Sequence, residues 1–216
     1  MKWIDIHTHK AYPDNSEVIF IRNAYLLEIE NQKENYFLSN GIHPWKVNQK
    51  NQLHLLSKLL GNKKVLALGE IGLDRFKPDF ALQVELFKKQ LEIGYQYKKP
   101  LILHCVKAYP EIISMIKDYP FPVVFHQYEG KLLQTQHLLE RPLVYFSFGK
   151  QLFRQNAPIV LLNTIPPNRI FLESDTMKLP IQSCYSKYCQ LMNFEPEFIQ
   201  NELAKNFEAV FGFDCL

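Results

Sequence analysis

Six residues of the types that bind metal ions stand at or just after the ends of short apolar segments. They are His7, His9, Glu70, His104, His126 and Asp175. Four imidazoles and two carboxylates suit a borderline divalent cation such as zinc, and also manganese or iron. Because six ligands exceed what one tetrahedral ion accepts from a protein, the set predicts two ions. The residue types therefore indicate metal-assisted hydrolysis.

The spacing of these residues suggests a role for each. His7 and His9 alternate along an extended segment, so both side chains can point to one face and bind the same ion. Glu70 is predicted to bridge the two ions, which at about 3.5–4 Å apart would stabilise both the entering and the leaving oxygen. Asp175 is predicted to bind the first ion and to accept the proton of the attacking water. Asp175 and Glu70 are therefore the candidate catalytic residues.

Each of these residues also has a structural interpretation. A single histidine at a strand end is more often a hydrogen-bonded structural residue than a ligand. A lone glutamate on an apolar strand is harder to explain in that way, because an unpaired buried charge is costly. Six independent structural explanations at six strand ends are less economical than one metal site.

Eight short apolar segments can position these residues. They span residues 3–7, 18–22, 36–42, 65–70, 101–104, 123–126, 143–148 and 170–173. Several are apolar at consecutive positions, as expected of strands covered on both faces. They alternate with stretches of helical periodicity, which predicts an α/β fold of the (β/α)8 TIM-type barrel class. In such a barrel the carboxyl ends of all strands open to one side, where the six side chains would meet.

Helical periodicity is clearest over 79–95, where Asp79 is a candidate N-cap, and over 196–211. Shorter helices are predicted at 53–60 and 112–117. Residues 24–29 could be helical or extended, so we expect the barrel to be shortened or distorted between the second and third strands. Residues 176–194 show no clear periodicity and are predicted to form a loop.

Composition favours one soluble domain over residues 1–216. Of the 216 residues 47% are hydrophobic, enough for a substantial core, and the net charge of +3 is too small to imply a nucleic-acid surface by itself. Without a signal-peptide pattern or a long apolar stretch, we expect a cytoplasmic monomer with no membrane association. The four cysteines form no CxxC pair and are expected to be reduced thiols.

Several motifs resemble those of the TatD-like hydrolases within the amidohydrolase superfamily. They are Asp5-Ile6-His7-Thr8-His9, Gly41-Ile42-His43-Pro44, Gly69-Glu70-Ile71-Gly72-Leu73-Asp74, a helix with Gln83, Phe87 and Gln90, Pro100 to His104, His126 with Gly130, Phe146 to Gly149, Glu173-Ser174-Asp175, and Asn206-Phe207. The pair of histidines alone is a weak signal. Its combination with the glutamate and aspartate motifs at this spacing is specific, and the likeness covers nearly the whole chain.

This resemblance implies a barrel with one or two divalent ions, zinc, magnesium or manganese. It makes His7, His9, Glu70 and Asp175 ligands of one ion, and Glu70, His104 and His126 ligands of the other. It also implies phosphodiester hydrolysis, as by a deoxyribonuclease, with DNA or a nucleotide as substrate. His43 is expected to contact substrate and Asp74 to orient the ligands or contact substrate, and a structural role is an equal alternative for both.

The sequence departs from the family pattern in its substrate-contacting periphery. Family members carry an arginine shortly after the fifth-strand histidine, where this chain has Lys107, which would bind phosphate without a bidentate fork. The segments 127–130 and 176–180 also differ from the family motifs. Trp45, Phe76 and Tyr128 could stack on a base, although aromatic residues more often pack under loops.

Three functions follow from these observations. The first is a metal-dependent phosphodiesterase or deoxyribonuclease. The second keeps the metal site but hydrolyses a C–N or ester bond in a small molecule, which the altered periphery favours. The third is a barrel that binds metal without turnover, against which the complete set of six ligands argues.

Overall fold

The computed structural model describes residues 2–13, 17–24 and 37–212. The backbone divides into two compact units. Unit 1 comprises Met1–Arg22 and Gln127–Leu216, and unit 2 comprises Asn23–His126. Most of the segment 24–35, where we expected a distortion, lies outside the described residues. Across the described residues, none of the helices has the length and apolar character needed to cross a membrane.

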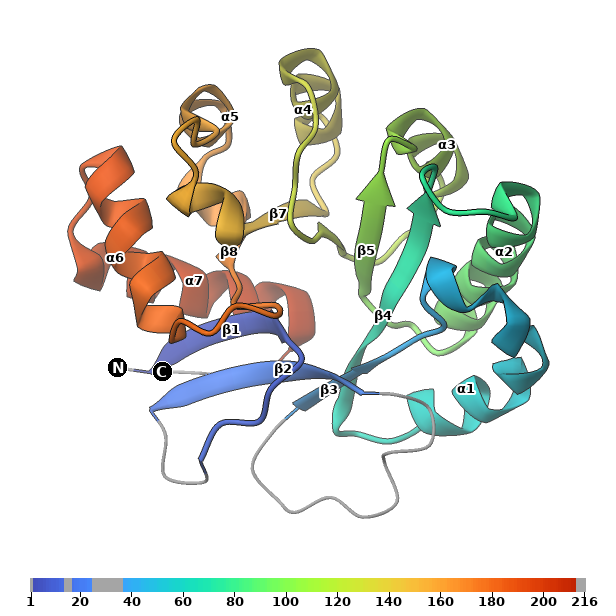
Figure 1. Ribbon diagram of the computed structural model, residues 1–216. Helices are drawn as coiled ribbons and strands as arrows, with labels where there is room; N and C mark the ends of the chain where they lie inside the picture. Colours follow the sequence, from blue (N-terminus) through green and yellow to red (C-terminus); the bar gives the residue numbers. More distant parts are fainter. Residues whose placement is uncertain (1, 14–16, 25–36, 213–216) are drawn as a thin grey trace. The chain divides into compact units, whose positions relative to one another are not determined.

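Unit 2 is built around a parallel sheet whose strands pair in sequence order. The strands are β3 (Phe37–Asn40), β4 (Val65–Asp74), β5 (Leu101–Val106) and β6 (Val123–Phe125). The helical segments are η2 (Pro44–Gln52), α1 (Leu53–Leu60), α2 (Phe80–Gln96) and α3 (Tyr109–Met115). Helices α1 and α2 pack against β4 (Figure 1). All residues of β4 except Leu66 are buried, as in a strand covered on both faces.

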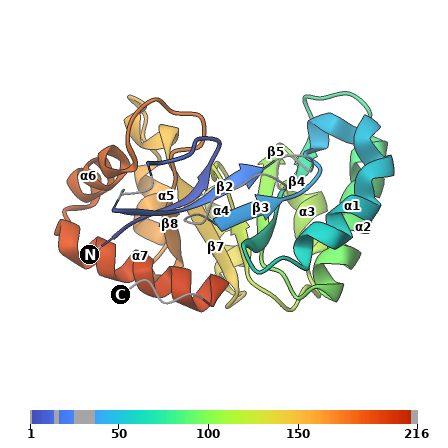
Figure 2. The same cartoon turned by 90° about the horizontal axis from the view of Figure 1, so that it is seen from below.

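Unit 1 contains the first and the last strands of the chain. They are β1 (Trp3–Thr8), β2 (Val18–Ala24, whose last two residues belong to unit 2), β7 (Val144–Phe148) and β8 (Ile170–Leu172). Its helical segments are α4 (Leu132–Leu139), η3 (Lys150–Phe153), α5 (Ile159–Thr164), η4 (Pro167–Arg169), α6 (Ile181–Met192) and α7 (Pro196–Phe211). Helix α7 packs on β1 and β8 (Figure 2) and buries Ile199, Leu203, Phe207 and Val210, the face that its periodicity predicts.

Within unit 1 the end of β8 is joined to the end of β1. The Asp175 N–H donates to the His7 carbonyl at 2.9 Å, and the His9 N–H donates to the Asp175 carbonyl at 3.2 Å. These bonds form a parallel bridge between Thr8 and Asp175. Pairing of the last strand with the first is the contact that closes a (β/α)8 barrel. It also connects the backbones of His7, His9 and Asp175.

The prediction of a loop over 176–194 is wrong, and the predicted N-cap of α2 is found without its capping bond. The segment 176–194 contains helix α6, whose buried face is made of Ile181, Cys184, Tyr185, Tyr188 and Cys189. This face has helical spacing but consists largely of cysteine and tyrosine, which do not read as a clear apolar stripe. Cys184 and Cys189 are free thiols, as expected. Asp79 stands at the N-cap of α2, but its side chain makes no capping hydrogen bond and its backbone is left-handed, with φ at 60°.

Two buried glutamines of α2 hold backbone segments that lead to candidate site residues. Gln90 Oε1 accepts a hydrogen bond from the Ile42 N–H at 2.7 Å, and Gln90 Nε2 donates to the Ile42 carbonyl at 3.0 Å. Gln83 makes the same two bonds with the Asp74 N–H and carbonyl, at 2.8 and 3.1 Å. The glutamines are seven positions apart, so both lie on one face of the helix. Helix α2 therefore fixes Asp74 and the residue before His43.

We expect Gln90→Leu to lower the free energy of unfolding by about 2 kcal/mol or more, because it leaves the buried N–H and carbonyl of Ile42 without partners. The measurement is urea denaturation of the chelator-treated protein. Gln96→Leu, an exposed position near the end of the same helix, is the control and should change stability by less than about 0.5 kcal/mol. Equal effects of the two substitutions would contradict the role of Gln90.

Candidate metal centre

In unit 2 the Glu70 carboxylate lies among three imidazoles. Glu70 Oε1 is 2.7 Å from His126 Nε2, 2.8 Å from His104 Nδ1 and 3.1 Å from His43 Nε2. His104 belongs to β5 and His126 directly follows β6, so neighbouring parallel strands bring them together. The sequence placed Glu70 at the end of a strand, but β4 runs on to Asp74. The pairing of β4 with β5 shifts register between Leu68 and Ile71, and such an irregularity re-aims a side chain.

Asn23 holds Glu70 from the other side. Its Oδ1 accepts a hydrogen bond from the Glu70 N–H at 3.1 Å, and its Nδ2 lies 3.5 Å from Glu70 Oε2. The two oxygens of the carboxylate are thus distinguished. Oε1 faces the imidazoles, and Oε2 faces an amide.

The surroundings of Glu70 favour the charged form. Burial acts to raise the pKa of Glu70, but the charge of His126 and the hydrogen bonds with His104, His126 and His43 outweigh it and hold this pKa well below its usual value. Burial lowers the pKa of His43 despite its hydrogen bond to Glu70. An ionised carboxylate and a neutral imidazole are the protonation states in which these residues bind a cation.

Asp74 connects His104 with an exposed aromatic residue. Its Oδ2 accepts a hydrogen bond from the indole N–H of Trp45 at 2.7 Å and lies 3.5 Å from His104 Nε2. Its Oδ1 accepts a hydrogen bond from the Phe76 N–H at 2.9 Å. A carboxylate beside the second nitrogen of a histidine fixes the tautomer and orientation of the ring. Asp74 therefore occupies the position of a residue that orients His104.

In unit 1 a second carboxylate lies beside two imidazoles. Asp175 Oδ1 is 3.5 Å from His9 Nε2 and 3.9 Å from His7 Nε2. The two imidazole rings are nearly perpendicular, with centroids 5.2 Å apart. His7 is fully buried and His9 is partly exposed. The alternation of residues along β1 and the bridge between the ends of β1 and β8 together produce this arrangement.

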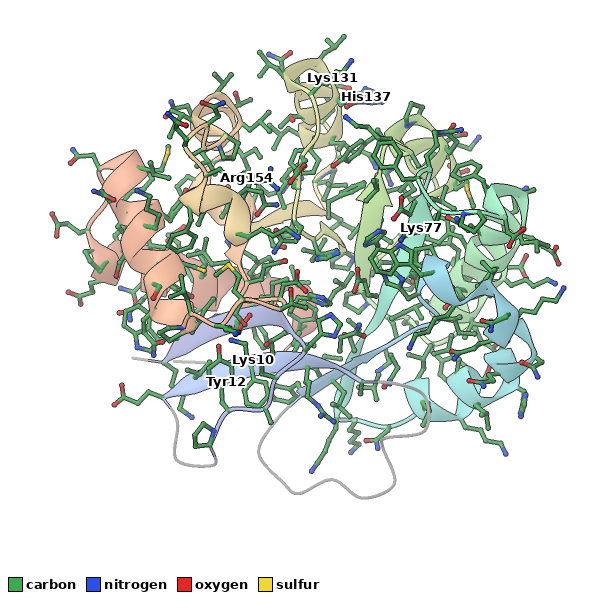
Figure 3. All side chains as sticks on the ribbon, in the orientation of Figure 1. Lys10, Tyr12, Lys77, Lys131, His137 and Arg154 are labelled. Atoms are coloured by element: carbon green, nitrogen blue, oxygen red, sulfur yellow. The ribbon has the colours of Figure 1, made fainter. Side chains whose placement is uncertain are left out.

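A buried hydrogen-bond network supports the Asp175 segment. Asp5 Oδ1 accepts from the Ser174 N–H at 2.9 Å, and Asp5 Oδ2 accepts from the Ser174 hydroxyl at 2.6 Å. The hydroxyl of Tyr12, which lies beside β1 and β2 (Figure 3), donates to Asp5 Oδ2 at 2.8 Å. Burial raises the pKa of Asp5 to about 6, and the bonds from Ser174 and Tyr12 only partly oppose this rise. Asp5 thus ties β1 to the residue before Asp175.

The lysine that lies near a candidate ligand is not the one that the sequence suggested. Lys150 Nζ is 3.9 Å from Asp175 Oδ2, and the Thr176 hydroxyl is 3.5 Å from the same oxygen. Lys107 is exposed, and its carbonyl accepts a hydrogen bond from Arg75 Nε at 3.1 Å. Among the described residues its ammonium makes no ion pair. The signal that could have identified Lys150 is its position shortly after β7, since the other candidates also follow strands.

Each unit has a group of donor atoms that is compact enough to hold a cation. These groups are His7, His9 and Asp175 in unit 1, and His43, Glu70 and His104 in unit 2, and within each group the atoms lie within 4.8 Å of one another. A mixture of imidazole nitrogen and carboxylate oxygen suits zinc or manganese. The residues present therefore fit a divalent cation in each unit. His43, which we expected near the substrate, stands inside the second group.

We expect His104→Ala to weaken binding of Zn²⁺ or Mn²⁺ by at least about tenfold, because loss of even an outer partner of a metal ligand costs about 10- to 100-fold. The measurement is calorimetric titration of the metal into chelator-treated, dialysed protein. His137→Ala removes an exposed imidazole on α4 and is the matched control. Binding that is unchanged at every site of His104→Ala would exclude a metal at the unit 2 group.

The contribution of Asp5 to the stability of the chelator-treated protein should fall as pH rises from about 4 to 6. The folded pKa of Asp5, about 6, exceeds its ordinary value of 3.8, so the folded state binds the proton more tightly. The contribution is present below 3.8 and lost above 6. Asp5→Asn should flatten this fall by about 3 kcal/mol, as measured by urea denaturation across that range. Asp118→Asn, at an exposed site, should keep the wild-type slope, and an equal slope in Asp5→Asn would contradict the prediction.

Comparisons of the sequence with known proteins point to one family. The family described as TatD related DNase matches residues 14–212. An uncharacterized metal-dependent hydrolase of Buchnera aphidicola subsp. Baizongia pistaciae is 30% identical over 210 residues, which cover 88% of this chain and 79% of that protein. The 3'-5' ssDNA/RNA exonuclease TatD of Dickeya dadantii is 29% identical over 169 residues, which cover 74% of this chain and 63% of that protein. The chain thus spans less than two thirds of that exonuclease.

A solved structure shows the same fold. The crystal structure of YjjV, a TatD homolog from Escherichia coli K12, matches with a TM-score of 0.85 and 23% identity over 98% of both chains. The fold class is therefore the (β/α)8 TIM-type barrel that the eight strands predict. With the family match over almost all of its length, the chain belongs to the TatD-related DNase family of metal-dependent hydrolases.

Proposed function

We propose that this chain is a metal-dependent phosphodiesterase of TatD type, a deoxyribonuclease that acts on nucleic-acid ends or nucleotides. The observation that carries the proposal is the presence in each unit of a compact donor group that is able to hold a divalent cation. Family membership supports the reaction class, and the name of the exonuclease relative supports a nucleic-acid substrate.

The candidate ligands divide between the two groups. His7, His9 and Asp175 would hold one cation. Glu70, His43 and His104 would hold another, and His126 is close to the same Glu70 oxygen. A divalent cation bound there supplies positive charge that stabilises oxygens on which negative charge develops during phosphodiester cleavage.

Asp175 has the geometry of a proton acceptor. Its Oδ1 faces the two imidazoles, whereas its Oδ2 faces Lys150 and Thr176. One oxygen can thus serve cation binding while the other accepts a proton from the attacking water. The Lys150 ammonium lies on the Oδ2 side of this carboxylate. Because Lys150 is half-exposed, it can also contact a phosphate oxygen.

We expect Asp175→Asn to lower the hydrolysis of a single-stranded DNA oligonucleotide by about 100-fold or more, because the amide cannot accept the proton. Turnover is measured with Mn²⁺, Mg²⁺ and Zn²⁺, and metal content is measured by elemental analysis. Much of the metal should remain, since the other candidate ligands are unchanged. The exposed Asp118→Asn is the control. Undiminished activity of Asp175→Asn would remove Asp175 from this role.

A second candidate is hydrolysis of a C–N or ester bond in a small molecule. It is favoured by the altered periphery, because Lys107 stands where family members carry an arginine and the segments 127–130 and 176–180 differ from the family motifs. Failure of the metal-loaded protein to cleave single- or double-stranded DNA, RNA and a model diester, together with cleavage of an amide or ester in a substrate panel, would replace the first proposal. A fully metal-loaded but inert protein would indicate a binding role.

A further inference from the structure

Trp45 is an exposed aromatic residue at the candidate metal group of unit 2. Its side chain is 56% exposed, and Phe76, in the segment after β4, is 75% exposed. Tyr128, the third aromatic residue that the sequence suggested for base stacking, is fully buried and bonds to the Thr135 hydroxyl at 2.9 Å. Trp45 therefore presents an exposed aromatic surface beside the candidate donor group.

The indole is held in place by polar contacts with the candidate metal ligands and their partner. Its N–H donates to Asp74 Oδ2 at 2.7 Å. Its ring is nearly perpendicular to the rings of His43 and His104, with centroids 4.9 and 5.9 Å away. The backbone N–H of Trp45 donates to His43 Nδ1 at 3.2 Å. The exposed surface of the indole is therefore pre-ordered beside the donor group, which reduces the entropy lost when a ligand binds.

The ammonium group of a lysine lies over the Trp45 indole. Lys77 Nζ lies 4.2 Å from the centre of the Trp45 ring. Lys77 follows β4 closely in sequence and lies beside its end (Figure 3). A cation at an aromatic face matches a nucleotide, in which a flat base is attached to a charged phosphate.

We propose that Trp45 is a stacking platform for the base next to the phosphodiester that is cleaved, and that Lys77 pairs with the adjoining phosphate. The proposal rests on the proposed phosphodiesterase activity and specifies its substrate class. A base within a duplex is already stacked on its neighbours, so the platform selects an unpaired end of single-stranded nucleic acid. Because every base has a flat face, the platform tolerates any sequence.

The test compares two single-stranded oligonucleotides that differ only at the cleaved end, where one carries a base and the other an abasic sugar. Trp45→Ala should lower kcat/KM on the base-bearing end by about tenfold more than on the abasic end, mainly through KM, whereas any loss that follows from the missing bond to Asp74 should be the same on both ends. Trp45→Phe, which keeps an aromatic face, should recover much of the loss. Tyr95→Ala, at an exposed position on α2, is the control and should match the wild type on both substrates. Equal losses on both ends, or equal cleavage of both ends by the wild type, would overturn the proposal.

A binding measurement separates this proposal from the phosphodiesterase itself. The chain has two tryptophans, so Trp3→Phe leaves Trp45 as the one indole. Its fluorescence should be quenched by a thymidine oligonucleotide and not by an abasic oligonucleotide of equal length. Quenching without cleavage would retain the platform and reject the phosphodiesterase. Absence of quenching would reject the platform, whatever the activity.

Discussion

The burial of the Glu70 carboxylate is the constraint on which the rest of unit 2 depends. An ionised carboxylate removed from water is costly unless neighbouring groups balance its charge. His43, His104 and His126 face one of its oxygens, and Asn23 lies at the other. The segments that carry His43, His104 and His126 must therefore meet at Glu70. His104 also lies beside Asp74, and Asp74 accepts a hydrogen bond from Trp45. The position of the exposed Trp45 is therefore linked to Glu70 through these two contacts.

Unit 1 places a buried carboxylate in surroundings that have the opposite effect. Asp5 is held by hydroxyl and N–H groups without a cation, and burial raises its pKa, whereas imidazoles lower the pKa of Glu70. The difference follows from the partners, since hydroxyl groups do not balance a negative charge as imidazoles do. Asp5 consequently works as a structural connector between β1 and Ser174. Glu70 is kept in the charged form that a cation requires.

The sequence was informative where function and strand periodicity coincide. His7, His9, His104 and His126 stand at strand ends, and parallel pairing within each unit brings them to carboxylates, as expected. The sequence could not reveal the direction of side chains that lie away from strand ends. His43 directly precedes the helical segment η2, and only the structure shows that it reaches Glu70. Lys107 was suggested because the family carries an arginine near that position, and adjacency in sequence does not determine where an ammonium points. Helix α6 was missed because its buried face consists largely of cysteine and tyrosine.

The two glutamines of helix α2 make hydrogen bonds with the backbone of Ile42 and Asp74, and not with the side chains of the residues that follow. The backbone N–H and carbonyl groups are the same for nearly every residue type. The exposed residues that follow Ile42 and Asp74 in sequence can therefore change without loss of these bonds. The fold thereby separates a rigid scaffold from a variable surface. Substitutions at positions such as 45 and 76 can change the substrate preference while the candidate metal ligands stay in place. The same design makes α2 intolerant of length change, because one inserted residue between its glutamines would rotate one amide by about 100° relative to the other.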